Sequence, residues 1–202
     1  MTITADIADT RPVDEPALID EADVSADEFP GGMGADLDTE TAVTSGVEAA
    51  FLTALMWAPV EMAREVRQIM AGDRWDPFLS GVHREIFGAI CVVLDSGAPP
   101  NPALVQAQLF ESGRLPAVEG QLLAIISPTR GPMVGGVDLP HLAAKVIDQW
   151  YRRGYRGFTA RMTQATDSAA VEELDGRWDV LNEHKKRAVS LWLAKRDRLA
   201  QL

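Results

Sequence analysis

Residues 75–99 read WDPFLSGVHREIFGAICVVLDSGAP, and this segment predicts most clearly what kind of structure the chain forms. After Ser80, apolar side chains recur at the spacing of one face of an α-helix, at Val82, Ile86, Phe87, Ile90 and Leu94. Gly97 follows as a typical residue for the end of a helix. The segment therefore predicts a buried helix from about Ser80 to Asp95. Two aromatic residues, Trp75 and Phe78, are expected to anchor the loop before it.

The rest of the folded part shows the same helical spacing, separated by glycine and proline. Ser45 and Glu48 have the spacing of a capping box, so the first helix is expected to begin at Ser45. Asn101 followed by Pro102 is typical of a helix N-terminus. We expect helices over residues 47–58, 59–71, 80–95, 102–112, 117–126 and 138–166. Since no segment alternates strictly in the way of a half-buried strand, the predicted fold class is all-α.

The charge of the chain is unevenly distributed. The 202 residues carry a net charge of −11, and residues 1–46 account for all of it with twelve acidic residues and one base, Arg11. Residues 47–150 carry −4 and residues 151–202 carry +4. Residues 1–45 are therefore predicted to be a disordered acidic tail, because they cannot bury enough apolar surface to offset the ordering entropy. The tail is either a solubilising leader or an arm that masks a basic surface.

The last segment, residues 167–202, is predicted to be a basic amphipathic helix beyond a helical domain over 46–166. Its seam positions alternate in steps of three and four, with lysine at two of the nine: Val171, Leu174, Trp178, Leu181, Lys185, Ala188, Trp192, Lys195 and Leu199. Two interpretations stay open. The helix either folds back on its own domain or docks in a groove on another chain, with Trp178, Leu181 and Trp192 as anchors.

Several classes of chemistry are not expected. No Gly-Lys pair occurs, so the sequence has no P-loop, and no G-x-S-x-G nucleophile motif occurs. The three histidines, His83, His141 and His184, lie more than 40 residues apart and do not form a zinc motif. We expect His83 to be a buried polar group that holds a loop. The sequence predicts a protein that is not an enzyme and has no cofactor and no metal.

The single cysteine, Cys91, excludes an internal disulfide and is expected to be buried and reduced, as in a cytoplasmic protein. The sequence contains no apolar run of roughly 18 residues, so no membrane span is expected. The first ten residues, MTITADIADT, lack the basic and apolar regions of a secretory signal.

Three motifs in this order resemble a known family. The loop Trp75-Asp76-Pro77-Phe78, the helix His83-Arg84-Glu85-Ile86-Phe87-Gly88-Ala89-Ile90 and the turn Asp95-Ser96-Gly97-Ala98-Pro99 resemble the N-terminal domain of replicative DnaB-type helicases. The similarity extends over about residues 47–165. It implies a small helical bundle that ends in a helical hairpin. The residues of this chain that match the family's structural motifs are Trp75, Phe78, His83, Arg84, Ile86, Phe87 and Gly97.

In that family this domain is a collar. Copies pair through their helical hairpins, form a ring, and present surfaces to primase and helicase loaders. The resemblance implies that Leu122, Ile126, Val146 and Trp150 are hairpin contacts. It also implies a non-catalytic role in assembling or regulating the primosome. The implied partners are a replicative helicase, a primase or a helicase loader. The chain is also expected to be able to form a homodimer or a higher oligomer. Helicase activity is not implied, because no P-loop is present.

The alternative function is nucleic-acid binding by the basic C-terminal region, with the acidic tail as a brake. Arg152, Arg153, Arg156 and Arg161 lie among Tyr151 and Tyr155, a combination that can meet phosphate.

Overall fold

The computed structural model describes residues 36–72, 75–127 and 138–202, and these residues form helices without any strand. The helices are α1 (Asp36–Trp57), α2 (Val60–Met70), α3 (Gly81–Asp95), α4 (Pro102–Glu111), α5 (Leu115–Ile126), α6 (Leu139–Ser168), a short 3₁₀ turn (Val171–Glu173) and α7 (Leu174–Leu199). The all-α prediction is confirmed. No helix in these ranges is both long and apolar enough to cross a membrane. The predicted disordered tail lies, over residues 1–35, outside the described residues.

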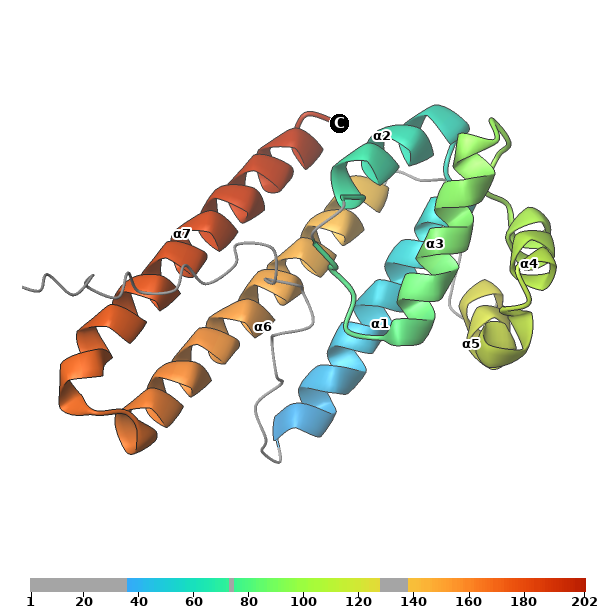
Figure 1. Ribbon diagram of the computed structural model, residues 1–202. Helices are drawn as coiled ribbons and strands as arrows, with labels where there is room; N and C mark the ends of the chain where they lie inside the picture. Colours follow the sequence, from blue (N-terminus) through green and yellow to red (C-terminus); the bar gives the residue numbers. More distant parts are fainter. Residues whose placement is uncertain (1–35, 73–74, 128–137) are drawn as a thin grey trace, which may run out of the picture.

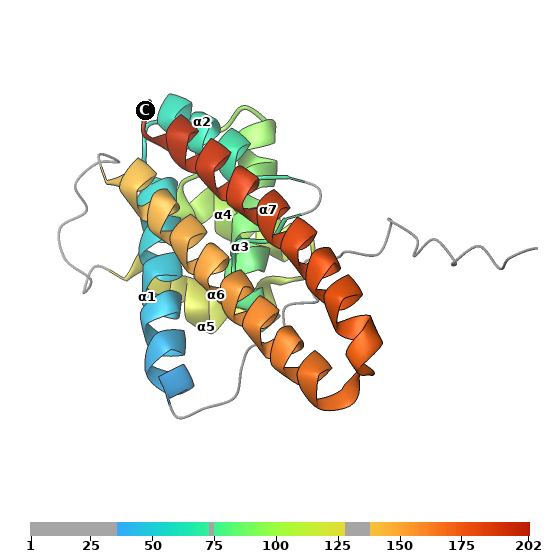
Figure 2. The same cartoon turned by 90° about the vertical axis from the view of Figure 1, so that its left-hand side faces the viewer.

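The helices form a body and a projecting arm (Figure 1). In the body, α1 packs against α3, α5 and α6, and α3 also packs against α4. The arm is an antiparallel hairpin of α6 and α7, whose distal end extends away from α4 and α5 (Figures 1 and 2). The fold is therefore a helical bundle with a helical hairpin, but the hairpin is not the predicted one. α6 pairs with the C-terminal helix α7, whereas the predicted hairpin lay within residues 46–166.

Three phenylalanines mark the centre of the core. The ring centroids of Phe51 and Phe78, and those of Phe51 and Phe87, lie 6.1 Å apart, and those of Phe78 and Phe87 lie 5.1 Å apart. These tilted contacts join α1, the loop before α3, and α3 itself. Phe78 is buried, so the prediction of an anchoring aromatic loop is confirmed.

Local capping explains where α3 and α4 begin and end. The hydroxyl of Ser80 accepts from the N–H of His83, and the side chain of Asn101 accepts from the N–H of Leu104 at 2.9 Å. Gly97 and Gly113 follow α3 and α4 with φ of +87° and +71°, a conformation that other residues rarely adopt. These boundaries agree with the sequence pattern.

The predicted start of the first helix is wrong. α1 begins at Asp36, so Ser45 lies inside the helix and does not cap it. Glu48 does not reach back to Ser45 either, because its carboxylate accepts hydrogen bonds from the N–H groups of Leu79 and Ser80. The boundary that placed residues 36–45 in a tail fails for the same reason: the helix continues through them.

The predicted hairpin contacts also need correction. The hairpin consists of α6 and α7, whereas Leu122, Ile126, Val146 and Trp150 come from α5 and the first half of α6. Leu122 and Val146 are fully buried in the core, and Ile126 and Trp150 are half-buried against it. Leu122 and Val146 are therefore not available for contact with another chain here, and Ile126 and Trp150 expose only part of their side chains.

Candidate interaction surfaces of the hairpin

A buried polar network explains the histidine-arginine motif of α3. Nδ1 of His83 lies 2.8 Å from Oε2 of Glu48, and both side chains are almost completely buried. Oε1 of the same carboxylate accepts from the N–H of Leu79 at 2.6 Å. Glu48 thus ties α1 to the loop before α3 and to the first turn of α3. His83 holds a loop, as predicted.

Arginines extend this network to α6. Arg153 donates to the carbonyl oxygen of Pro77 at 2.6 Å, and Arg84 forms an ion pair with Asp76. Burial lowers the pKa of Arg153, while the charges of Glu48 and Asp76 act in the opposite direction. Arg153 therefore faces the body and is not available as a surface phosphate ligand.

The C-terminal part of α7 is attached to the body by a buried lysine. Lys195 is only 8% exposed. Its Nζ donates to the carbonyl oxygen of Ile69 and lies 4.2 Å from the ring centroid of Trp75. Nε1 of Trp75 donates to Met70 at 2.8 Å, and the ring meets Trp150 edge-on at 5.1 Å. Burial lowers the pKa of Lys195 to about 8, and the charge of Arg198 acts in the same direction.

A second set of contacts joins α7 to α6. The ring of Trp192 stacks on Tyr151 with centroids 4.9 Å apart. Oδ1 of Asp148 accepts from Nε1 of Trp192 at 2.9 Å and also pairs with Arg196. These contacts show that α7 folds back on its own domain, which was the first of the two open interpretations. Trp192 is therefore an internal anchor of this chain.

A basic and aromatic hollow lies on the hairpin beside this stack. It has a volume of about 480 Å³ and is lined by Asp148, Tyr151, Arg152, Tyr155, Arg156, Trp192 and Arg196. Arg152 and Arg156 are exposed, and Tyr155 is nearly half exposed. Of the predicted basic residues, the structure brings Arg152 and Arg156 together here and turns Arg153 inward.

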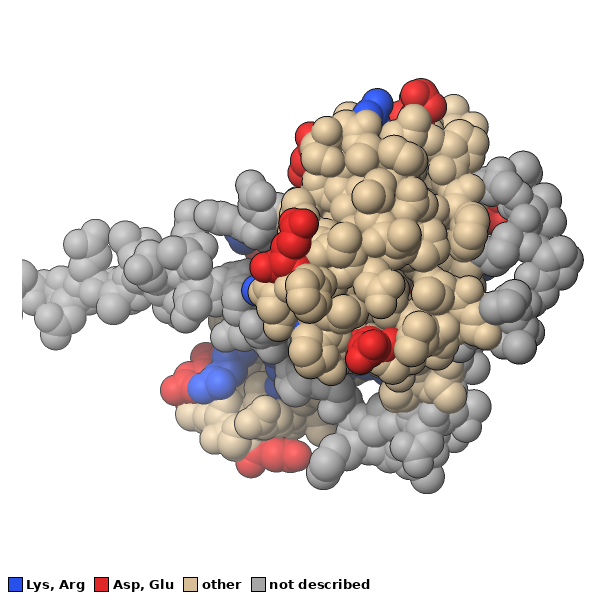
Figure 3. Space-filling model, turned by 90° about the vertical axis from the view of Figure 1, so that its right-hand side faces the viewer, with Lys and Arg blue, Asp and Glu red and all other residues tan. Residues whose placement is uncertain are grey.

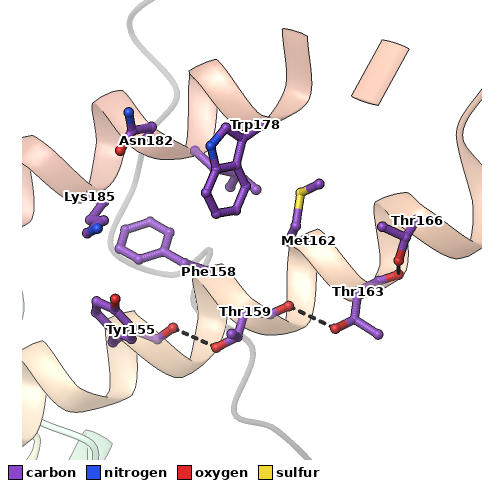
Figure 4. A pocket seen from close by; sticks show the side chains of 10 residues that line it. Tyr155, Phe158, Thr159, Met162, Thr163, Thr166, Trp178, Asn182 and Lys185 are labelled. Carbon is purple, nitrogen blue, oxygen red and sulfur yellow. Dashed lines mark hydrogen bonds between the residues drawn. The ribbon is translucent and has the colours of Figure 1, made fainter. Parts of the chain in front are cut away.

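A largely apolar cleft of about 280 Å³ lies between the distal parts of α6 and α7. Phe158 and Met162 from α6 and Trp178 from α7 point into the space between the helices (Figure 4). Leu181 also lines it, so the cleft contains two of the three predicted docking residues. Trp178 remains 54% exposed. Lys185, a seam lysine, lies at the cleft with its Nζ 5.8 Å from the ring centroid of Tyr155.

Threonines along one wall of the cleft keep it apolar. The hydroxyls of Thr159, Thr163 and Thr166 donate to carbonyl oxygens of α6 itself, at 2.9, 3.1 and 2.6 Å. Because these donors are satisfied within the helix, they require no partner in the cleft. The cleft thus suits an apolar side chain.

An apolar surface that the sequence pattern did not predict lies on α4 and α5, on the side of the body away from the hairpin tip. Phe110 of α4 is 73% exposed, and Leu104 of α4 and Leu123 of α5 are also exposed. This side of the molecule shows few charged residues (Figure 3). α4 is apolar around most of its circumference although only Val105 and Leu109 are buried. This pattern in the sequence of α4 could have indicated an interaction surface, because a helix that is apolar on all sides is usually buried against other parts of a protein or a partner.

The described residues contain no group of three or more side chains that could hold a metal ion. Cys91 is half-buried, and burial raises the pKa of its thiol. A raised pKa reduces the reactive thiolate fraction.

Comparisons with known proteins identify the fold. No protein-family model matches the sequence, and no curated protein matches it. Among solved structures, the crystal structure of the N-terminal domain of DnaB helicase from Mycobacterium tuberculosis matches with a TM-score of 0.56 and 19% sequence identity. The match covers 69% of this chain and 94% of that domain. The chain therefore has the fold of the DnaB helicase N-terminal domain.

Proposed function

We propose that this chain is a non-catalytic DNA-replication protein that binds a replicative helicase, its primase or its loader, and that it acts in the cytoplasm to assemble or regulate the primosome. The observation that supports this proposal is the fold match, which extends over 94% of a DnaB N-terminal domain.

The hairpin carries exposed apolar side chains that are candidates for contact with such a partner. Besides Trp178, the exposed apolar side chains of α7 include Val180 and Leu193, at 52% and 46% exposure. Neither residue lines the apolar cleft between the distal parts of α6 and α7, and neither belongs to the buried core. Exposed apolar residues on a projecting helix suit a protein interface, because their burial against a partner contributes free energy without any chemical step.

The direct test is a pull-down of purified helicase, primase and loader from the same organism by the immobilised chain. We expect retention of at least one of them, and its loss in the double variant Val180→Asp, Leu193→Asp. The matched control is Val92→Asp on α3, a residue of similar exposure on the body. The proposal fails if the wild-type chain retains none of the three proteins.

The basic hollow favours nucleic-acid binding as a second candidate function. Arginine side chains beside aromatic rings can contact phosphates and stack on bases. The hollow combines Arg152 and Arg156 with the exposed ring of Tyr155. Residues 1–35 carry nine acidic residues and one base, so their charge opposes such binding by the full chain.

The test compares the full chain with a chain that lacks residues 1–35, a deletion that leaves α1 intact. We expect the shortened chain to bind fluorescent single-stranded DNA at low salt, and binding to weaken steeply as salt is raised. The variant Arg152→Glu should bind less, whereas Arg177→Glu, outside the hollow, should not differ. Absence of binding by the shortened chain at low salt rejects this function.

A further inference from the structure

Positive and negative charges are separated along the α6–α7 arm. The parts of the two helices nearest the body, residues 139–161 and 184–202, carry eleven bases and two acids (Figure 1). The distal part, residues 162–183, carries one base, Arg177, and six acids. All six acidic side chains are exposed: Asp167, Glu172, Glu173, Asp175, Asp179 and Glu183. The net charge of the arm therefore changes from +9 near the body to −5 at the tip.

The apolar cleft lies within this acidic part of the arm. Phe158, Met162 and Trp178 point into it from the two helices (Figure 4). Its volume of about 280 Å³ is at the lower limit of pockets that hold small molecules, which typically measure about 300–1,000 Å³. The cleft therefore suits a single large apolar side chain, and methionine and aromatic rings make favourable contacts with such a group.

The acidic side chains beside the cleft are only partly neutralised. Within the described part of the chain, Glu173 pairs with Arg177 at 3.0 Å, whereas Asp175 and Asp179 form no ion pair. These two aspartates lie four residues apart on α7, on either side of Trp178 in the sequence. Like charges at this spacing repel each other on a helix surface, so a cation bound beside Trp178 relieves the repulsion.

The exposed segments of this chain lack the charge that the cleft requires. Residues 1–35 carry nine acids and one base, and residues 86–126, which include the exposed Phe110, carry three acids and one base. Both are negative, as the distal arm is, and the approach of like charges costs free energy. The basic residues 184–202 are held in the folded arm by Trp192 and Lys195. A positively charged occupant must therefore come from another protein.

We propose that the cleft binds a cationic amphipathic segment of a different protein. One aromatic or long aliphatic side chain of that segment enters between Phe158, Met162 and Trp178. Lysine or arginine side chains beside it meet Asp175 and Asp179. This inference goes beyond the proposed function, because the cleft is separate from the residues proposed to contact the helicase, primase or loader.

Fluorescence anisotropy with labelled synthetic peptides tests the proposal. The first peptide has a central phenylalanine between pairs of lysines, the second has glutamates in place of the lysines, and the third has alanine in place of the phenylalanine. We expect the first peptide to bind the full chain saturably, with a Kd between about 10 μM and 1 mM. The other two should bind at least about tenfold more weakly. Added salt should weaken binding of the first peptide, because it screens exposed charges.

Variants of the chain locate the binding site. Trp178→Asp should weaken binding of the first peptide at least about 30-fold, the effect of removing a central aromatic contact. Leu193→Asp, a change at similar exposure on α7 but outside the cleft, should bind as the wild-type chain does. Asp179→Lys should weaken binding about two- to fivefold. The same change at the basic end of α7, Asp197→Lys, should leave it unchanged. Circular dichroism checks that each variant folds.

Three results with the peptides would overturn the proposal. The first is no saturable binding of the lysine peptide up to about 1 mM. The second is equal binding of the lysine and glutamate peptides, and the third is unchanged binding by Trp178→Asp.

Two further results would assign the cleft to another occupant and would also overturn the proposal. Self-association of the wild-type chain that Trp178→Asp abolishes, measured by light scattering, would assign the cleft to a second copy. Peptide binding that is seen only after deletion of residues 1–35 would assign it to that segment of the same chain.

Discussion

Nδ1 of His83 lies 2.8 Å from the carboxylate of Glu48 in a part of the core that excludes water almost completely. The same carboxylate also accepts from two backbone N–H groups at the entry to α3. Glu48 is thus an acceptor for three donors from a segment that begins more than thirty residues further along the chain.

Replacement of Glu48 by glutamine tests this network. The amide retains one oxygen and introduces an NH₂ group, so at least one of the three donors faces another donor. We expect Glu48→Gln to lower the free energy of unfolding by about 3 kcal/mol. Glu111→Gln, the same change at an exposed site, should stay within about 0.5 kcal/mol. Urea denaturation measures both, and equal midpoints for the two variants would contradict the network.

Capping residues give a second prediction. Ser80→Ala and Asn101→Ala each remove a side-chain acceptor from a helix N-terminus and should cost about 1 kcal/mol. Ser45→Ala should cost less than about 0.5 kcal/mol, because Ser45 lies inside α1. Thermal and urea unfolding of the three variants will measure this order. A Ser45 variant as unstable as the other two would show that the helix begins at Ser45 after all.

The attachment of α7 gives a third prediction. Trp192→Phe retains a ring against Tyr151 but loses the hydrogen bond to Asp148, and should cost about 1 kcal/mol. Trp192→Ala also loses the stacked ring and should cost about 2–3 kcal/mol. Hydrogen exchange should then show faster exchange along α7. Trp178→Ala serves as the control, since an exposed tryptophan contributes little within one chain. If the Trp178 and Trp192 variants behaved alike, the fold-back contacts would not hold the helix.

The pH dependence of stability tests Lys195. Its pKa is about 8 in the folded chain, against an ordinary value of 10.5. Between these values the unfolded chain holds a proton that the folded chain has released, so the free energy of unfolding rises with pH across this interval. Below pH 8 both states are protonated, and the cost of burying the charge is fully present.

Lys195→Met provides the comparison, because methionine retains an apolar stem and does not titrate. The difference in unfolding free energy between the wild-type chain and this variant should increase in favour of the wild-type chain from pH 8 to pH 10. Guanidinium titrations at several pH values will measure the difference. A constant difference would show that Lys195 keeps an ordinary pKa.

Features of this fold that depend on neighbouring residues were predictable from the sequence, whereas features that depend on distant segments were not. The boundaries of α3 and α4 were predictable because Ser80, Gly97 and Asn101 act on the backbone within a few residues. The role of Glu48 was not predictable, because its hydrogen-bond partners lie in a distant segment of the chain. Its spacing to Ser45 indicated a capping box instead. Val146 was predicted as a contact with another chain, but it is buried within this one. An apolar stripe on a helix does not show whether its own chain or a partner covers it.

The seam of α7 illustrates the same limit at two residues. Lys185 and Lys195 interrupt the heptad pattern, and the sequence alone gives no reason for them. In the structure each ammonium group lies near an aromatic ring, that of Tyr155 or that of Trp75, supplied by another segment. Both lysines thus fit the interface, but only when the opposing residues are known.

Trp75, Trp150 and Trp192 all lie where the arm meets the body, two of them in direct contact and the third stacked on Tyr151. The chain has five tryptophans in total. Three of the five tryptophans thus lie at this joint, so loosening of α7 should expose them to water and shift their ultraviolet emission to longer wavelength without any attached dye. A spectrofluorimeter can follow that movement in the unlabelled protein.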